Sequence, residues 1–144
     1  MKIIIEEPQE GEEELIIVRC RLMPPELLQA LTLLKVQQAL VAYDGTEIFR
    51  ISPTNIYYIE AVDNKTFLYC RDKVYESKQK LYELEETFAN SDFLRVSKSV
   101  ILNLSKIKSL SPALSGRFQA SLENGERIII SRQYVSELKK KLGI

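Results

Sequence analysis

The sequence predicts a mainly β protein of the α+β class, with antiparallel strands and a few short helices. Short apolar segments recur at close spacing from residue 47 to residue 130, which is typical of antiparallel sheets rather than of βαβ units. The dipeptides Asp44-Gly45 and Asn124-Gly125 stand next to such segments and predict hairpin turns. With 144 residues, 45% of them hydrophobic, the chain is long enough for one ordinary domain and a small accessory part.

Residues 1–45 predict a small α/β extension of the strand–strand–helix kind. Residues 2–6 and 15–20 are rich in Ile and other residues that favour strands. The acidic segment between them, which contains Pro8 and Gly11, suits an exposed loop. Such a short module buries too little surface to stand alone, so we expect it to pack on the rest of the chain or on a second copy.

Pro25 and Glu26 predict the first turn of a helix, because proline and carboxylates favour this position. The helix is expected to run to about Gln38 and to be followed by a strand over residues 40–43. Its apolar stripe is wider than one packing face needs. Either both faces pack on the chain's own strands or one of them contacts a second copy. The stripe consists of Leu27, Leu28, Leu31, Leu33, Leu34 and Val36.

Residues 46–144 predict a second domain that is mostly β. Asn124-Gly125 is expected to form a type I′ turn between the last two strands. One helix is expected after Ser77 as its N-cap and another from Ser131, and each carries one apolar face that suits a core. The nine expected strands cover residues 47–51, 57–62, 66–71, 74–76, 94–96, 100–102, 107–110, 117–123 and 126–130.

Charge is distributed unevenly, although the whole chain is neutral with 20 Lys and Arg against 20 Asp and Glu. Residues 1–49 hold four basic side chains against nine acidic ones, a net of −5, whereas residues 95–144 hold ten against three, a net of +7. A basic C-terminal part is what the neutralisation of phosphates requires. A solvated surface is the alternative interpretation, and the neutral total argues against indiscriminate attraction to polyanions.

Composition argues against several other classes of protein. No apolar run is long enough to span a bilayer, and residues 1–5 do not resemble a secretory signal, so we expect a cytoplasmic protein. The chain has no His, and Cys20 and Cys70 are far apart, so we expect reduced thiols, no metal site and no cofactor. With no nucleophile beside a base and no Gly-rich phosphate loop, we expect neither an enzyme nor a small-molecule substrate.

The segment FLRVSKSVILN, residues 93–103, interrupts an apolar strand pattern with a polar triplet. Residues on both sides of the triplet favour burial in a sheet, whereas Ser97, Lys98 and Ser99 are small or cationic and form hydrogen bonds. A packed sheet gains nothing from such a triplet. The pattern therefore predicts a firmly held polar loop between two strands.

Together with other motifs, this segment resembles the LytTR family of bacterial DNA-binding domains, from about residue 46 to the C-terminus. The resemblance implies stacked antiparallel sheets with short peripheral helices. The family pattern usually has His where this chain has Ser97. The first 45 residues are too few for a receiver domain, so we expect a standalone regulator. The motifs are, in order, YIEA ending at Ala61, the turn 63–65, the string from Arg95 to Asn103, Asn124-Gly125 and Ser131-Arg132.

By this resemblance and by their chemistry, four residues on three connections are expected to contact bases. Asn64 and Lys65 protrude from a turn between two strands. Lys98, at the apex of the polar loop, can donate to guanine O6 and N7 but cannot accept from an adenine amino group, so it favours G over A. Arg132 is expected in the first turn of the last helix, where the helix dipole disfavours a cation unless an anion is near. An ordinary turn or an exposed cation is the alternative at each position.

A second set of residues is expected to contact the DNA backbone, because basic and hydroxyl side chains on strands and turns bind phosphates without identifying bases. Asn103 is expected instead to fix the polar loop through its amide. The backbone set comprises Arg95, Ser97, Ser99, Lys106, Lys108, Arg117 and Ser131.

The sequence therefore predicts a sequence-specific bacterial transcription regulator. As the family resemblance implies, we expect it to bind short direct repeats in double-stranded DNA as a homodimer, through loops in the major groove. The alternative is a non-catalytic interaction module, or a co-regulator of a membrane-bound protein, that uses the acidic extension and the leucine-rich helix. DNA binding in the presence of heparin discriminates between the two.

Overall fold

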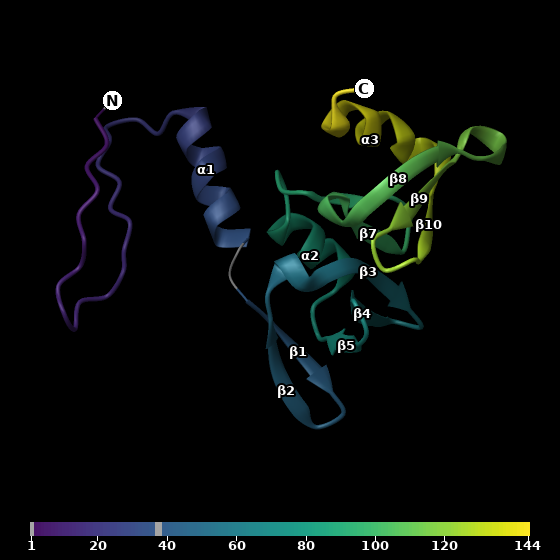
Figure 1. Ribbon diagram of the computed structural model, residues 1–144, viewed down its shortest axis with the longest axis horizontal. Coiled ribbons are helices and arrows are strands. Elements are labelled where there is room, and N and C mark those ends of the chain that lie inside the picture. Colours follow the sequence, from purple (N-terminus) through teal and green to yellow (C-terminus); the bar gives the residue numbers. More distant parts are fainter. Residues whose placement is uncertain (1, 37–38) are drawn as a thin grey trace.

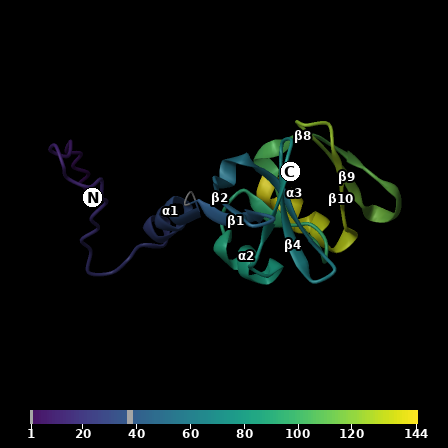
Figure 2. The same cartoon turned by 90° about the horizontal axis from the view of Figure 1, so that it is seen from below.

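The computed structural model describes residues 2–36 and 39–144. Residues 40–144, here called the β body, form a seven-stranded and a three-stranded antiparallel sheet with short helices around them (Figure 1). The predicted fold class, mainly β with stacked sheets, is confirmed. Helix α1 (Pro25–Val36) and the residues before it lie beside the β body rather than within it, as two views at right angles show (Figures 1 and 2).

The larger sheet has the strand order β2-β1-β5-β4-β3-β7-β6, with antiparallel neighbours. Two-residue turns join β1 to β2 and β3 to β4, so that Asp44 lies opposite Glu47 and Val62 opposite Lys65. The strands expected after residue 46 are present, with ends within two residues of those expected. The seven strands are β1 (Leu40–Asp44), β2 (Glu47–Ile51), β3 (Ile56–Val62), β4 (Lys65–Cys70), β5 (Val74–Ser77), β6 (Phe93–Arg95) and β7 (Val100–Asn103).

The smaller sheet has the strand order β10-β9-β8. A type I′ turn was expected between the last two strands, but the structure has a three-residue loop there. Gly125 N donates to Leu122 O at 3.0 Å, and Leu122 N donates to Glu126 O at 2.8 Å. Such a loop needs a positive φ only at its last residue, and in this turn Gly125 alone has one, at 90°. The strands are β8 (Ile107–Pro112), β9 (Phe118–Leu122) and β10 (Arg127–Ile130).

Two hydrophobic clusters lie on opposite faces of the larger sheet. Because side chains alternate along a strand, Ile59 and Ile101 pack with helix α2 (Leu81–Thr87) on one face. On the other face, Tyr58 and Leu102 pack with the smaller sheet and helix α3 (Val135–Leu142). Strands β3 and β7 are therefore fixed from both sides, and so are the ends from which their connecting segments leave.

The strands expected over residues 2–6 and 15–20 do not form. Neither segment pairs with another strand in the described part of the chain, and an isolated β segment cannot satisfy its backbone groups within the protein. A turn between them is present, because Glu12 N donates to Gln9 O at 3.0 Å. The extension therefore begins with two unpaired segments joined by a turn rather than with a hairpin.

The helix expected from Pro25 is confirmed, and its expected end at Gln38 lies outside the described residues. The helix expected after Ser77 begins at Leu81 and has Lys80 as its N-cap, so the predicted cap was wrong. Ser77 is the last residue of β5 and is buried in the sheet, so it lies too far before the helix to cap it. Among the described residues, no helix has the length and apolar composition that a bilayer crossing requires.

Candidate nucleic-acid interface

The residues expected to contact bases lie on three segments that follow strands of the β body, here called the three connections. The first, residues 63–65, lies at the turn from β3 to β4; the second, residues 97–99, joins β6 to β7; the third, residues 131–132, follows β10. Long stretches of sequence separate them. Their arrangement therefore depends on contacts between distant parts of the chain.

Two backbone hydrogen bonds bring the three connections together. Ala61 N, near the end of β3, donates to Ser99 O at 2.8 Å. Ser131 N donates to Val96 O at 2.8 Å. The polar loop is thus attached to the strand that leads into the first connection and to the start of the third. Backbone bonds of this kind fix the relative positions of segments more firmly than contacts between exposed side chains do.

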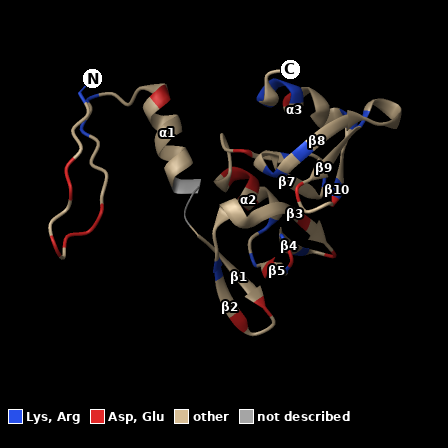
Figure 3. Cartoon of the chain, viewed as in Figure 1, with Lys and Arg blue, Asp and Glu red and all other residues tan. Residues whose placement is uncertain are grey.

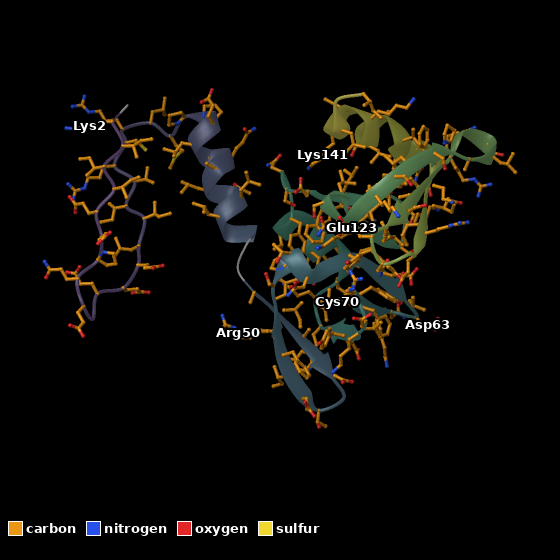
Figure 4. All side chains as sticks on the ribbon, in the orientation of Figure 1. Lys2, Arg50, Asp63, Cys70, Glu123 and Lys141 are labelled. Atoms are coloured by element: carbon orange, nitrogen blue, oxygen red, sulfur yellow. The ribbon has the colours of Figure 1, made fainter. Side chains whose placement is uncertain are left out.

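The first connection is a hairpin turn of type I′. Asp63 and Asn64 have φ values of 50° and 64°, and this turn requires positive φ at both central residues. Asp and Asn tolerate this backbone better than other residues apart from glycine. Asp63, Asn64 and Lys65 are exposed, and Figure 4 shows Asp63 at the tip of the hairpin, on the other side of the view from Arg50. The turn therefore projects polar side chains from a rigid ladder.

Arg95 holds the second connection in shape. Its Nε donates to Ser97 O at 2.7 Å and its Nη2 donates to Lys98 O, so the guanidinium binds two carbonyl groups of the loop. Its Nη1 donates to Glu85 Oε2 at 3.0 Å, which ties the loop to α2. All three nitrogens of Arg95 thus have partners within the protein. The side chain of Lys98, at the apex, remains exposed.

The polar loop also closes on itself, as the sequence predicted. Val96 N donates to Val100 O at 3.0 Å, and Ser99 N donates to Ser97 Oγ at 3.3 Å. Val96 has no exposed surface and packs in the core between the sheets. The loop therefore has an apolar base and a polar apex, and the serines of the triplet contribute to its shape.

The third connection differs from the expectation. Arg132 begins not an α-helix but a short 3-10 turn, η4 (Arg132–Tyr134), which leads into α3, and Ser131 forms no side-chain cap. The aliphatic part of Arg132 lies against Gly116, where an added β-carbon would come within 2.9 Å of Arg132 Cδ. Gly116 has a φ of 75°, in the left-handed region. The segment between β8 and β9 therefore packs against the aliphatic part of the Arg132 side chain.

Several of the residues expected to contact the DNA backbone lie at the same end of the molecule as the three connections. Arg117 directly precedes Phe118, which pairs with Ile130, so it lies beside the third connection. Arg117 is exposed, and its Nε donates to Leu114 O at 3.3 Å. The others in this group are Ser97, Ser99 and Ser131, which belong to the three connections themselves.

Lys106 lies towards the opposite end of the molecule. Its Nζ is 5.1 Å from the ring centroid of Tyr57, which is the second residue of β3. Val62 follows Tyr57 by five residue steps of strand, or roughly 17 Å at the rise of an extended chain. Lys108 follows on β8, with an exposed side chain. The expected backbone set is therefore spread along the molecule rather than gathered around the three connections.

A second group of cations surrounds a cavity of about 420 Å³ near Lys106. The sequence analysis did not identify this group, because its members come from β2, from the loop between β4 and β5 and from the 3-10 turn before β8, with no common motif. Some of these cations have partners: Lys73 Nζ lies 3.0 Å from Asp44 Oδ2, and Arg71 Nη1 donates to the Tyr57 hydroxyl at 3.5 Å. The basic residues that line the cavity are Arg50, Arg71, Lys73 and Lys106.

Two stacked tyrosines occupy the space between the sheets. The ring centroids of Tyr58 and Tyr69 are 4.3 Å apart, and the Tyr69 hydroxyl donates to Glu60 Oε1 at 3.2 Å. Burial raises the pKa of both phenols above the ordinary value, and the carboxylate of Glu126 raises the pKa of Tyr58 further. Both tyrosines therefore stay neutral at physiological pH and add no negative charge to a surface that would face DNA.

The charge asymmetry predicted from the sequence is visible in the fold. Figure 3 shows Lys and Arg on the smaller sheet and on α3, whereas the segment before α1 carries several acidic residues, all of them Glu. Helix α3 holds Lys139, Lys140 and Lys141 in its last turn, where the helix dipole favours cations without any ligand. The basic residues that call for another explanation are those on the connections.

Two residues that shape the site were not found by sequence reasoning. Glu85 binds Arg95 from α2, and Gly116 supports Arg132 from the connection between β8 and β9. A Ser-Gly pair at 115–116 does indicate a turn, but no sequence signal tells which distant side chain rests on it. Glu85 looks like an ordinary exposed helix residue until the loop is placed beside it.

Comparison with known proteins agrees with this geometry. The family model described as the LytTr DNA-binding domain matches residues 46–143. A solved LytTr DNA-binding domain from Bacillus cereus has a TM-score of 0.70 and 28% sequence identity to this chain, and the match covers 74% of this chain and 98% of that one. The matched region includes all three connections.

Relatives in other bacteria match the same part of the chain. The sensory transduction protein LytT of Enterococcus faecalis is 30% identical over 97 residues, which are 67% of this chain and 40% of that protein. LytT of Bacillus subtilis is 30% identical over 108 residues, covering 75% of this chain and 45% of that protein. An uncharacterized HTH-type transcriptional regulator of Staphylococcus aureus is 27% identical over 118 residues, covering 82% of this chain and 80% of that protein.

This chain thus spans less than half the length of the two LytT proteins and most of the length of the S. aureus protein. The family match covers most of the chain, and the resemblance noted in its motifs is confirmed. The fold of two antiparallel sheets, the three connections on it and the family match agree: the chain belongs to the LytTR family of DNA-binding domains.

Proposed function

We propose that this protein is a sequence-specific bacterial transcription regulator that places the three connections in major grooves of duplex DNA. The observation that supports this most strongly is the pair of backbone hydrogen bonds that attaches the polar loop both to the end of β3, next to the first connection, and to the start of the third. Sequence recognition requires that base-contacting side chains keep fixed separations, and closed turns on a packed sheet provide this. Four exposed polar residues lie on the three connections: Asn64, Lys65, Lys98 and Arg132.

In this proposal, each of these side chains has a distinct partner. Asn64 can bind adenine through its amide, and Lys65 can donate to an acceptor beside it. Lys98 donates to guanine at the apex of the polar loop. Arg132 presents a guanidinium that matches the O6 and N7 acceptors of guanine in a bidentate arrangement. Each good base contact contributes about 1–3 kcal/mol of discrimination against the wrong base.

The proposed phosphate contacts are revised by the geometry. Arg95 has all three nitrogens engaged within the protein, so we assign it to shaping the loop rather than to binding phosphate. Lys106 reaches phosphates only where the DNA continues past the opposite end of the β body. The phosphate set near the three connections consists of Ser97, Ser99, Arg117 and Ser131, whereas Lys108, at the start of β8, lies farther from them. If the five exposed cations Lys65, Lys98, Lys108, Arg117 and Arg132 together neutralise about five phosphates, log affinity is expected to fall against log salt with a slope of roughly −4 to −5.

The finer features of the function also belong to the proposal. We infer that the protein acts in the cytoplasm and occupies short direct repeats as a homodimer, as the family resemblance implies. The names of the relatives, a sensory transduction protein and a transcriptional regulator, support a role in gene control. The basic C-terminal part and the acidic N-terminal segment give the molecule one side suited to DNA and another that DNA repels.

Binding to genomic fragments selected by the protein tests this function. We expect Lys98→Ala and Arg132→Ala each to weaken binding to a selected repeat by roughly 5- to 100-fold and to relax the base preference at one position. Arg50→Ala is the control, because it removes one exposed cation from β2 at the far side of the β body. Unchanged affinity in the double variant contradicts the proposal. Loss of the salt slope without loss of base preference assigns both residues to phosphates.

A second candidate function has one observation in its favour. Helix α1 exposes several leucines to solvent on its surface, among them Leu28, which is 57% exposed, and Leu33, which is 45% exposed. Neighbouring exposed apolar side chains are typical of a protein-binding surface. A non-catalytic module that binds another regulatory protein, including one in the membrane, would use such a face. If no DNA fragment binds in the presence of heparin while the β body remains folded, this second function replaces the first.

A further inference from the structure

The N-terminal segment has two apolar arms that nothing in the described chain covers. The first arm is residues 2–6 and the second is residues 14–19. Ile5 is 91% exposed and Ile16 is 68% exposed, although β-branched residues of this kind favour the interior of a sheet. Figures 1 and 2 both show the arms apart from the β body, and Figure 4 shows their side chains projecting without contact to it.

The arms run side by side but do not pair. The turn at Gln9 and Glu12 has its own hydrogen bonds: Glu12 N donates to Gln9 O at 3.0 Å, and Gln9 N donates to Glu12 Oε2 at 2.8 Å. Beyond the turn, the described arms form no ladder with each other. Residues of both arms, among them Ile4 and Leu15, instead line a cavity of about 750 Å³ between them.

Repulsion between like charges disfavours a hydrogen-bonded hairpin formed by the two arms of one chain. The turn places Gln9 opposite Glu12, and a hairpin continued from it sets Glu7 opposite Glu14 and Lys2 opposite Arg19. Like charges directly opposite each other destabilise an antiparallel pair. A hairpin within one molecule would therefore have one repulsive pair beside the turn and another at its open end.

The second arm is complementary to itself when two copies run antiparallel. Its sequence, ELIIVR, sets Glu14 opposite Arg19 of a second copy, and by symmetry Arg19 opposite Glu14. Between these two ion pairs, Leu15 faces Val18 and Ile16 faces Ile17 of the second copy. Apolar and opposite-charge pairs of this kind are those that stabilise antiparallel strands.

The first arm has the same property. In KIIIE, Lys2 falls opposite Glu6 of a second copy and Ile3 opposite Ile5, with Ile4 facing its own counterpart. In the open hairpin Ile4 lies opposite Ile17, so the centres of the two arms are neighbours and one two-fold axis can serve both. The antiparallel arrangement of both pairs of arms also places the two acidic turns at opposite ends of the contact, which keeps them apart.

We propose that the N-terminal arms of two copies of this chain pair antiparallel, arm with identical arm, and hold the protein as a two-fold dimer without DNA. We assign a second copy as the partner of the arms for two reasons. Each arm places opposite charges face to face when it pairs antiparallel with an identical arm, and the two arms of one chain place like charges face to face. This interface is independent of the DNA-binding surface on the β body. It goes beyond the proposed function by naming the segment that joins the two copies.

Charge reversal in the second arm tests the proposal on the full-length protein. Sedimentation over a concentration series is expected to show a dimer for the unaltered chain. Glu14→Lys and Arg19→Glu each turn two attractive pairs into repulsive ones, so each raises the dimer dissociation constant by roughly tenfold or more. The double variant Glu14→Lys/Arg19→Glu restores both pairs and dimerises as the unaltered chain does.

Mixing the two single variants gives a sharper outcome. Lys at position 14 of one variant then meets Glu at position 19 of the other, and Arg19 meets Glu14, so an equal mixture recovers the dimer that each variant alone has lost. The arms do not touch the β body, so its circular dichroism should be the same in every variant. An unaltered chain that stays monomeric overturns the proposal. So do single variants that dimerise normally, because the contact then lies elsewhere, for instance on α1.

Cross-linking checks the register of the first arm. In a background of Cys20→Ser and Cys70→Ala, we expect Ile4→Cys to form a disulfide between two copies under mild oxidation, because position 4 faces itself across the axis. Ile3→Cys is the control, since position 3 faces position 5 and its own counterpart is displaced along the strand. Equal cross-linking by both variants contradicts the antiparallel register. DNA is absent from all these measurements, so failure here leaves the DNA-binding proposal to its own test.

Discussion

Gly116 lies directly beneath Arg132, so close that a β-carbon on the glycine would come within 2.9 Å of Arg132 Cδ and 3.0 Å of Cγ. The contact joins the segment between β8 and β9 to the segment after β10. It explains how an exposed arginine on a short 3-10 turn receives a preferred direction. Gly116, which has no side chain of its own, therefore limits where the side chain of Arg132, proposed to contact bases, can lie.

The first prediction concerns this contact. Gly116→Ala should weaken DNA binding by roughly tenfold, because the new methyl group displaces the Arg132 side chain from its support. Fluorescence anisotropy with a selected repeat measures the effect. Gly125→Ala is a matched control: Gly125 also has a positive φ, at 90°, but no atom lies within 4 Å of its added β-carbon. Both variants should lose about 1–2 kcal/mol of unfolding free energy from backbone strain, and equal affinities would exclude a positioning role for Gly116.

The second prediction distinguishes two roles for Arg95. Arg95→Lys keeps the charge but cannot bind Ser97 O, Lys98 O and Glu85 at once, so the polar loop should lose its shape and DNA affinity should fall. The dependence of log affinity on log salt should keep its slope. A titration with increasing salt measures both quantities. If Arg95→Ala reduces the slope by about one unit, Arg95 contacts a phosphate after all.

The third prediction uses the type I′ turn to remove a side chain without disturbing the backbone. Asn64→Gly should leave the unfolding free energy unchanged or raise it slightly, because glycine adopts the φ of 64° without strain. It should nevertheless weaken binding and abolish the preference for one base. Asp63→Gly relaxes the same turn and keeps Asn64, so it should bind at least as tightly as the unaltered chain. Selection of bound sequences from a randomised pool compares the variants.

The fourth prediction concerns a buried amide that holds the start of β3 to the end of β7. Asn103 is 2% exposed; its Nδ2 donates to Ile56 O at 2.8 Å and its Oδ1 accepts from Ser105 N at 3.1 Å. Asn103→Ala should lower the unfolding free energy by about 1–3 kcal/mol, because it leaves a buried carbonyl without a donor. Urea denaturation measures this. Ser105→Ala, at an exposed position, should cost clearly less, and equal losses would show that the amide bonds are not what matters.

The fifth prediction follows from the raised pKa values of Tyr58 and Tyr69. Below about pH 10 the phenols are neutral in both the folded and the unfolded chain, so their contribution to the unfolding free energy does not change with pH. Above it, the unfolded phenols ionise while the buried ones stay neutral, so the unfolding free energy should fall as pH rises. Denaturant titrations between pH 9 and pH 11 measure the decline, which Tyr58→Phe should make shallower. Tyr82→Phe, at a position 63% exposed, is the control and should leave the decline unaltered.

Much of the β body was predictable because its local signals agree. The nearly continuous apolar runs of β3 and β7 reflect burial on both faces, and the hairpins are closed by residues that tolerate positive φ. The expected strands at residues 2–6 and 15–20 failed for a complementary reason. Their composition suits a sheet, but composition does not supply the neighbouring strand that a sheet needs.

The candidate site was predictable residue by residue but not as a surface. Lys98 stood out because three polar residues interrupt an apolar pattern, and the family resemblance grouped it with Arg132. The hydrogen bond from Ser131 to Val96 that unites them joins segments far apart in sequence, and no local pattern encodes it. The same holds for Glu85 and Gly116, whose roles arise only from what folding places next to them.

Among the described residues, no backbone hydrogen bond joins residues 2–36 to residues 39–144. In the dimer proposed above, the arms and the β bodies are expected to obey different symmetries. Arms that pair by rotation demand a palindromic arrangement, whereas β bodies on tandem half-sites must follow one another by translation along the helix axis. The proposed dimer is thus joined head to head at one end, while both of its β bodies point the same way along the proposed operator.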